Sequence, residues 1–176
     1  MIGLFSGALG PGALRAIGFV LVAVSVIGPS LPAGWLFQQP PMPLAALWAA
    51  YGWAAEDEGG VRSPIVLALF GLLHDVLAGG PVGLFMALYC SAYLIGRTVA
   101  VMMSSPNLIS LWGGFIVTAL ACVGLAAVLL RWSLGAHVSV RPFAEAVAIT
   151  ALLFPLARPL YMSATPSLRT QMGSRS

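Results

Sequence analysis

The chain has 176 residues, of which 60% are hydrophobic and 7% are charged, and its formal net charge is +3. A soluble domain carries roughly 25% charged residues, so this chain has too few to cover a surface that faces water, and we expect it to lie mainly in lipid. Its basic residues are all arginines, and their scattered positions argue against a nucleic-acid-binding protein.

Six apolar runs are candidates for membrane-spanning helices, which need about 20 residues each. In chain order they are residues 16–37, 42–55, 64–78, 82–103, 108–130 and 143–162. The predicted fold is therefore an all-α integral membrane protein with about six transmembrane helices in one bundle. Residues 1–162 form one membrane-embedded domain, and residues 163–176 form a polar tail in the cytoplasm.

Prolines are expected to distort the first and the last of these helices. Pro29 and Pro32 should bend or break the outer third of the first, and Pro155 and Pro159 should kink the sixth. The second and third runs, within residues 42–78, are short. They form either two spans or a re-entrant pair, and both arrangements return the chain to the same side of the membrane.

The arginines predict the orientation of the chain, because cytoplasmic loops carry an excess of positive charge. An inside N-terminus places most of them inside, and these are Arg15, Arg62, Arg97, Arg158, Arg169 and Arg175. Only Arg131 and Arg141 then lie outside. The excess of six inner over two outer arginines predicts a multi-pass protein with cytoplasmic N- and C-termini.

The motifs of soluble catalytic sites are missing from the sequence. It contains no glycine-rich phosphate loop, no paired-cysteine motif and no HExxH sequence. We therefore expect a protein that is not an enzyme, without a cofactor or metal. The tryptophans, mostly near the ends of the runs, are interpreted as an interfacial aromatic belt.

Asp75 is the aspartate expected at membrane depth, where a charged side chain costs about 2.5–3.5 kcal/mol and should find a partner inside the bundle. Ala68, Gly71 and Gly79 share its helical face. Such a stripe of small residues favours close packing of two membrane helices. Its neighbour His74 cannot face the same way, so the two are not a ready-made dyad. We expect His74 to be neutral and hydrogen-bonded to another helix.

Glycines and Pro81 follow Asp75 and predict a turn. Backbone N–H groups of Gly79, Gly80 and Gly83, or of the helix that begins after them, are candidate partners for the carboxylate. We expect this local capping role, with the binding of a partner or ligand as the alternative.

Two further charged residues are candidates for structural or partner contacts. Arg97, near the inner end of its helix, is expected to extend its charge to the membrane surface. Glu145 is expected to form an i,i+4 ion pair with Arg141, with a partner contact as the alternative.

The segment from about Pro43 to Arg97 resembles the rod shape-determining protein MreD family of bacterial inner membranes. The shared pattern is a proline and an apolar run, "PMPLAALWAAYGWAA", that contains Tyr51, followed by G-L-x-x-D at Gly71, Leu72 and Asp75. A glycine at position 79 or 80 and the helix-opening Gly83 complete it.

The resemblance implies a non-enzymatic, inner-membrane component of the cell-wall elongation machinery that maintains rod shape. Such proteins bind the bitopic protein MreC. Through it they are linked to the peptidoglycan polymerase RodA, a class B penicillin-binding transpeptidase and the cytoskeletal filament MreB. No small-molecule substrate is expected.

The family's fold is also similar to the membrane subunit of energy-coupling-factor vitamin transporters, which supplies an alternative function in small-molecule binding. Two features speak against it. The first run has no Ala-x-x-x-Ala docking step, and the interior offers few polar groups for a ligand.

Overall fold

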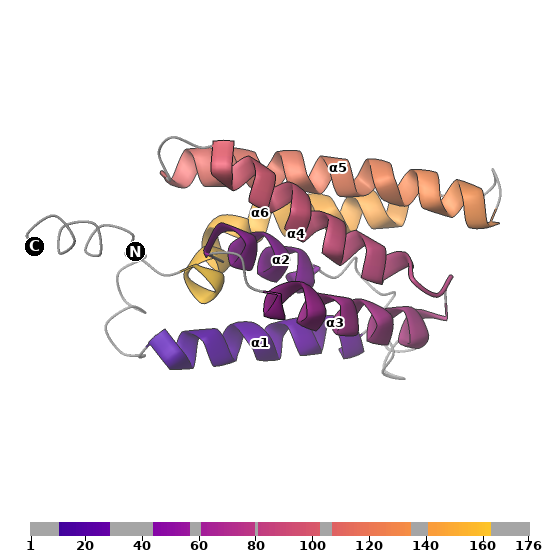
Figure 1. Ribbon diagram of the computed structural model, residues 1–176, viewed down its shortest axis with the longest axis horizontal. Coiled ribbons are helices and arrows are strands. Elements are labelled where there is room, and N and C mark those ends of the chain that lie inside the picture. The colour runs from indigo at the N-terminus through magenta and orange to yellow at the C-terminus, as the bar shows by residue number, and fades with distance from the viewer. Residues whose placement is uncertain are drawn as a thin grey trace, which may run out of the picture.

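The structure, a computed structural model, describes residues 11–28, 44–56, 61–79, 81–102, 107–134 and 141–162, and Figure 1 shows the arrangement of the helices that they form. The helices are α1 (Pro11–Ile27), α2 (Ala45–Glu56), α3 (Arg62–Ala78), α4 (Leu84–Met102), α5 (Leu108–Leu134) and α6 (Arg141–Tyr161). The prediction of an all-α protein with six helices is confirmed for this part of the chain. The predicted tail, residues 163–176, lies outside it.

Length separates these helices into two groups. By length and composition, α4, α5 and α6 are long and apolar enough to cross a membrane. The helices α1 and α3 have 17 residues and α2 has 12. At 1.5 Å per residue α2 is about 18 Å long, well short of a hydrocarbon layer of about 30 Å. Of the six predicted spans, three are therefore supported as complete ones.

Several boundaries differ from those predicted. The first helix begins before Arg15, which lies inside it, and Pro29 and Pro32 fall outside the described residues. The fifth continues past Arg131 to Leu134. The sixth continues through both of its prolines to Tyr161.

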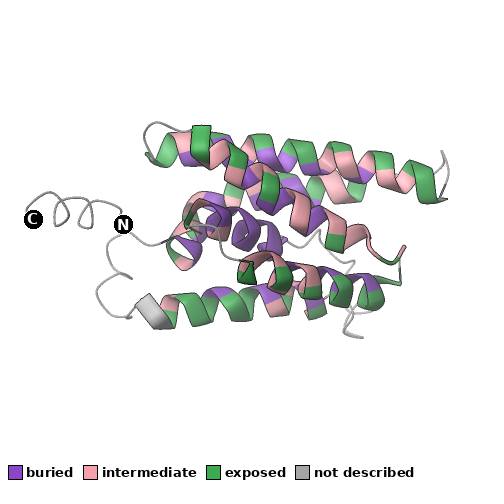
Figure 2. Ribbon diagram, viewed as in Figure 1, coloured by how far each residue is buried: buried purple, intermediate pink, exposed green. Residues whose placement is uncertain are grey.

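The short helix α2 lies in the centre of the bundle. Figure 1 shows it between α1 and α3 on one side and α5 and α6 on the other, and Figure 2 shows it buried along nearly its whole length. Its sequence, "AALWAAYGWAAE", has no polar face. A helix that is apolar all round is stable only when it is enclosed. The other helices surround α2 and expose apolar outer faces, as expected of a protein in lipid.

Glycines allow the neighbours of α2 to approach closely. A Cβ atom on Gly52 would lie 2.6 Å from the Cβ of Tyr161 in α6. A Cβ atom on Gly96 in α4 would lie 2.9 Å from the Tyr51 ring. Small residues therefore set the spacing at the centre of this bundle, as is usual for packed membrane helices.

The two ends of the bundle carry different numbers of arginines. The helices α1, α3 and α5 begin at the end where α2, α4 and α6 finish (Figure 1). This arginine-rich end carries four arginines of the described helices: Arg15, Arg62, Arg97 and Arg158. The opposite end, called the turn end because α3 and α4 are joined there, carries Arg131 and Arg141.

Candidate functional site

Asp75 lies near the last turn of α3, at the turn end, and is only 1% exposed. Its Oδ2 accepts hydrogen bonds from the backbone N–H of Gly83 at 2.8 Å and of Met86 at 3.4 Å. Its Oδ1 accepts one from the N–H of Phe85 at 2.8 Å. These donors belong to the first turn of α4 and its approach, where N–H groups have no partner within the helix. The predicted capping role of Asp75 is confirmed.

Two glycines of the turn have a positive φ. Gly79 is the C-cap of α3 with φ 64°, and Gly83 has φ 97°. Both conformations are left-handed, and glycine adopts them without the steric cost of a Cβ atom. Gly80 lies outside the described residues. The apparent G-x-x-x-G step from Gly79 to Gly83 is therefore part of a turn and not a helix-packing motif.

Gly71 lies at a close contact between α3 and α4. A Cβ atom at this position would lie 2.4 Å from the Cα and 2.5 Å from the N of Met86. The predicted packing stripe is thus correct at Gly71. It is wrong at Gly79, where an added Cβ atom would meet nothing within 4 Å.

His74 is 5% exposed and binds to α4 beside Asp75. Its Nδ1 lies 2.6 Å from the Tyr89 hydroxyl oxygen, and its ring stacks on Phe85 with centroids 3.8 Å apart. The predicted hydrogen bond to another helix is confirmed. Consecutive positions on a helix point in different directions, so His74 and Asp75 hold different parts of α4.

Tyr51 lies in the core and not on a surface that a partner can reach. It is 0% exposed, and its ring makes edge contacts with Phe115 and Phe154, whose rings stack on each other at 4.4 Å. Its hydroxyl has no hydrogen-bond partner within the described part of the chain. Of the two predicted roles, structural or partner-binding, this geometry favours the structural one for Tyr51.

Arg97 and Glu145 lie away from this site. Arg97 is half-buried in α4 and forms no ion pair with any residue that the structure describes. Glu145 accepts a hydrogen bond from the Arg141 Nε at 2.8 Å, and both side chains are exposed. The predicted i,i+4 pair is confirmed.

Thr150 is a buried polar anchor that was not predicted. Its Oγ1 accepts a hydrogen bond from the N–H of Leu44, just before α2, at 2.8 Å, and its carbonyl accepts one from the Trp48 Nε1 at 2.7 Å. Trp48 is 7% exposed, so its assignment to an interfacial belt is wrong. A threonine within an apolar run carries no sequence signal of a partner 106 residues away.

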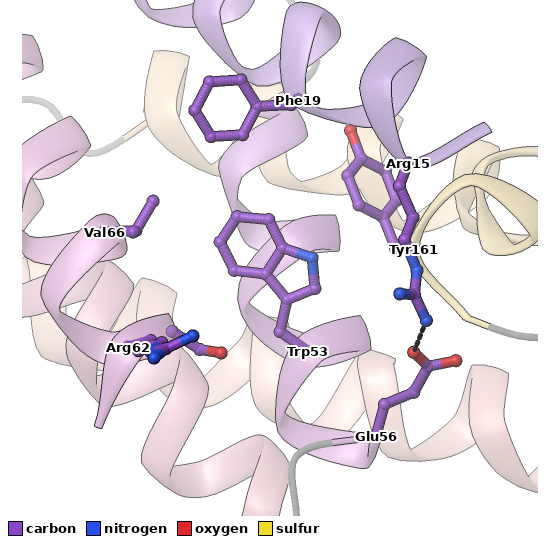
Figure 3. A pocket seen from close by; sticks show the side chains of 8 residues that line it. Arg15, Phe19, Trp53, Glu56, Arg62, Val66 and Tyr161 are labelled. Carbon is purple, nitrogen blue, oxygen red and sulfur yellow. Dashed lines mark ion pairs between the residues drawn. The ribbon is translucent and has the colours of Figure 1, made fainter. Parts of the chain in front are cut away.

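A cleft of about 370 Å³ at the arginine-rich end was not predicted either. It lies between α1, α2, α3 and α6 (Figure 3). Its lining residues are Arg15, Phe19, Trp53, Glu56, Arg62, Ser63, Val66 and Tyr161. The Nη2 of Arg15 lies 3.7 Å from the Oε2 of Glu56. Its lining residues come from four helices and lie between positions 15 and 161, which explains why no local motif reveals the cleft.

Within the described ranges, no group of three histidine, cysteine, aspartate or glutamate side chains is arranged to hold a metal ion. The Asp75 carboxylate instead accepts hydrogen bonds from backbone N–H groups, and the His74 Nδ1 lies within hydrogen-bond distance of the Tyr89 hydroxyl. Comparison of the chain with family models, characterised proteins and solved structures finds no match.

Proposed function

We propose that this chain is an MreD-like, non-enzymatic component of the machinery that elongates the bacterial cell wall. In this role it lies in the inner membrane and binds the transmembrane helix of an MreC-like protein. Through that protein it links a RodA-like polymerase and a class B penicillin-binding transpeptidase to MreB. Packing of a helix into a groove of small residues is the expected mode of binding.

The observation that carries the proposal is the joint role of three residues of the resembling segment. Gly71 permits the contact between α3 and α4, Asp75 binds the start of α4, and Gly83 has the left-handed conformation of the turn. These are positions through which the resemblance to the MreD family is defined. Their packing gives a physical reason for the pattern.

The polar chemistry near α4 supports a scaffold more than an enzyme. Both Asp75 oxygens accept backbone hydrogen bonds, and the His74 Nδ1 lies within hydrogen-bond distance of Tyr89. Groups engaged in this way hold two helices together. They are poorly placed to exchange protons with a substrate, which a general acid or base must reach directly or through one water molecule.

We further propose that all six helices lie in the membrane, with both termini in the cytoplasm. The enclosed α2 needs no complete span of its own because α1, α4 and α6 shield it from lipid. Four described arginines at one end against two at the other support a cytoplasmic arginine-rich end.

The test is affinity purification of the full chain from bacterial membranes in mild detergent, with the co-purified proteins identified by mass spectrometry. MreC-like and RodA-like partners are expected. Recovery of a vitamin or an ATPase module instead would favour the transporter alternative. Normal rod shape after depletion of the chain would contradict the proposal.

Variants relate this experiment to the site. Asp75→Leu is expected to reduce recovery of the MreC-like partner, because α4 loses its anchor, whereas Arg131→Gln at the exposed end of α5 is the matched control. Unchanged partner recovery and membrane level for Asp75→Leu would show that the α3–α4 junction does not support the binding surface.

A further inference from the structure

The cleft at the arginine-rich end has one repeated feature: three of its walls carry a charged residue near a helix end and an apolar residue one turn farther in. Arg15 and Phe19 are four residues apart on α1, Glu56 and Trp53 three apart on α2, and Arg62 and Val66 four apart on α3. Residues at these spacings lie on the same face of a helix. The cleft is therefore amphipathic, with charge toward one end.

The arrangement of the lining side chains in Figure 3 agrees with an amphipathic cleft. Figure 3 shows Trp53 between Arg62 and Arg15, and it shows Phe19 and Val66 on the side away from Glu56. Farther along α3, the Phe70 ring makes an edge contact with Phe19 at 5.2 Å and joins α1 to α3. The apolar part of the cleft thus continues into the packed interface of these two helices.

The charged part of the cleft favours an anion. Its lining includes two arginines and one glutamate, a formal sum of +1. Arg62 is exposed and forms no ion pair with a described residue. The first turn of α3 contains no acidic residue, and its N-cap, Val61, makes no side-chain capping bond. Among the described residues no side chain caps this end of α3, and the helix dipole adds positive charge beside Arg62.

We propose that this cleft binds the phosphate-bearing headgroup of an anionic phospholipid, with an acyl chain directed toward Phe19 and Val66. Arginine suits this role because its planar guanidinium donates two parallel hydrogen bonds to phosphate oxygens. Ser63 adds a hydroxyl donor at the same wall. Next to the cleft, Ile65 and Leu69 expose 55% and 63% of their surface, which provides an apolar face for the rest of the chain.

The test is native mass spectrometry of the full chain in non-ionic detergent, titrated with short-chain phosphatidylglycerol, short-chain phosphatidylcholine or inorganic phosphate. Phosphatidylglycerol is expected to bind more tightly than phosphatidylcholine. Loss of the charged, bidentate contact in Arg62→Gln should weaken its binding about tenfold. Arg131→Gln, an exposed arginine at the turn end, is the matched control and should leave binding unchanged.

A second variant distinguishes a lipid from a free phosphate. Val66→Ser removes an apolar wall without touching the charges, so it should weaken phosphatidylglycerol binding and leave inorganic phosphate unaffected. The proposed site would be wrong if the two lipids bound with equal affinity. It would also be wrong if Arg62→Gln and Arg131→Gln lost the same amount of phosphatidylglycerol affinity. Inorganic phosphate binding as tightly as phosphatidylglycerol, with no effect of Val66→Ser, would overturn the lipid assignment. None of these outcomes depends on the MreC-like partner.

Discussion

The two ends of the bundle use charged residues in opposite ways. At the turn end, Asp75 is buried, and both of its oxygens accept N–H donors from the start of α4. At the arginine-rich end, Arg15 and Arg62 border an open cleft, and the ion pair of Arg15 with Glu56 is 3.7 Å long.

The difference shows what decides whether a charged residue stabilises the fold or can bind a ligand. Asp75 is satisfied by backbone donors that are fixed by the fold, so removal of its carboxylate leaves those part-buried donors without their acceptor. Arg15 and Arg62 at the other end are exposed, so their loss changes the charge of the surface more than it changes the fold. Substitutions at Asp75, Gly71 and Arg15 compare the two ends, in order of decreasing effect.

The largest effect is expected for Asp75→Leu. It leaves the N–H groups of Gly83 and Phe85 without their acceptor, and the cost should be about 3 kcal/mol or more. Asp75→Asn should cost roughly half as much, because one amide oxygen replaces one carboxylate oxygen while the amide NH₂ group faces the other donor. Unfolding of the purified protein by SDS, followed by circular dichroism, measures both. Equal stability of the two variants would contradict the two-oxygen cap.

Gly71→Ala is expected to have an intermediate effect, about 1–3 kcal/mol of lost stability in the same assay. The added Cβ atom meets the backbone of Met86, which cannot move as a flexible side chain does. Gly113→Ala in α5 is the matched control, because nothing lies within 4 Å of its added Cβ atom. If both alanine variants were equally stable, the close contact of α3 with α4 would be less tight than the structure indicates.

The smallest effect is expected for Arg15→Gln at the arginine-rich end. Its side chain is 69% exposed and its pair with Glu56 is long, so the free energy of unfolding should change by less than about 0.5 kcal/mol. A decrease in the free energy of unfolding as large as that of Asp75→Leu would contradict the difference between the two ends.

The features that were predicted correctly are those encoded within a short stretch of chain. Asp75 and its donors are 8 to 11 residues apart, and the glycines between them show that the chain must turn back there. Helical spacing likewise identified the Arg141–Glu145 pair. In both cases the residues that form the local sequence pattern also form the contact in the folded structure.

The features that were missed depend on helices that meet only in the folded bundle. The burial of most of α2 can be explained by its lack of a polar face, but no local pattern indicates its contact with Thr150. The cleft is assembled from four helices, and each contributes residues that look ordinary in the sequence. Gly79 was wrongly assigned to the packing stripe, because the sequence does not distinguish a glycine required by backbone conformation from one required by helix packing.

The attachment of α2 to Thr150 has a consequence for synthesis of the protein. The residues at the start of α2 leave the ribosome 106 residues before the threonine that binds them. At typical rates of about 5–20 residues per second, this interval is about 5–20 s. During that time α2 is too short to cross the bilayer unaided and has no C-terminal helix to enclose it. The nascent chain thus depends on the insertion machinery or on transient packing against α1 and α4, and a chain truncated before α6 should be a substrate for membrane proteases.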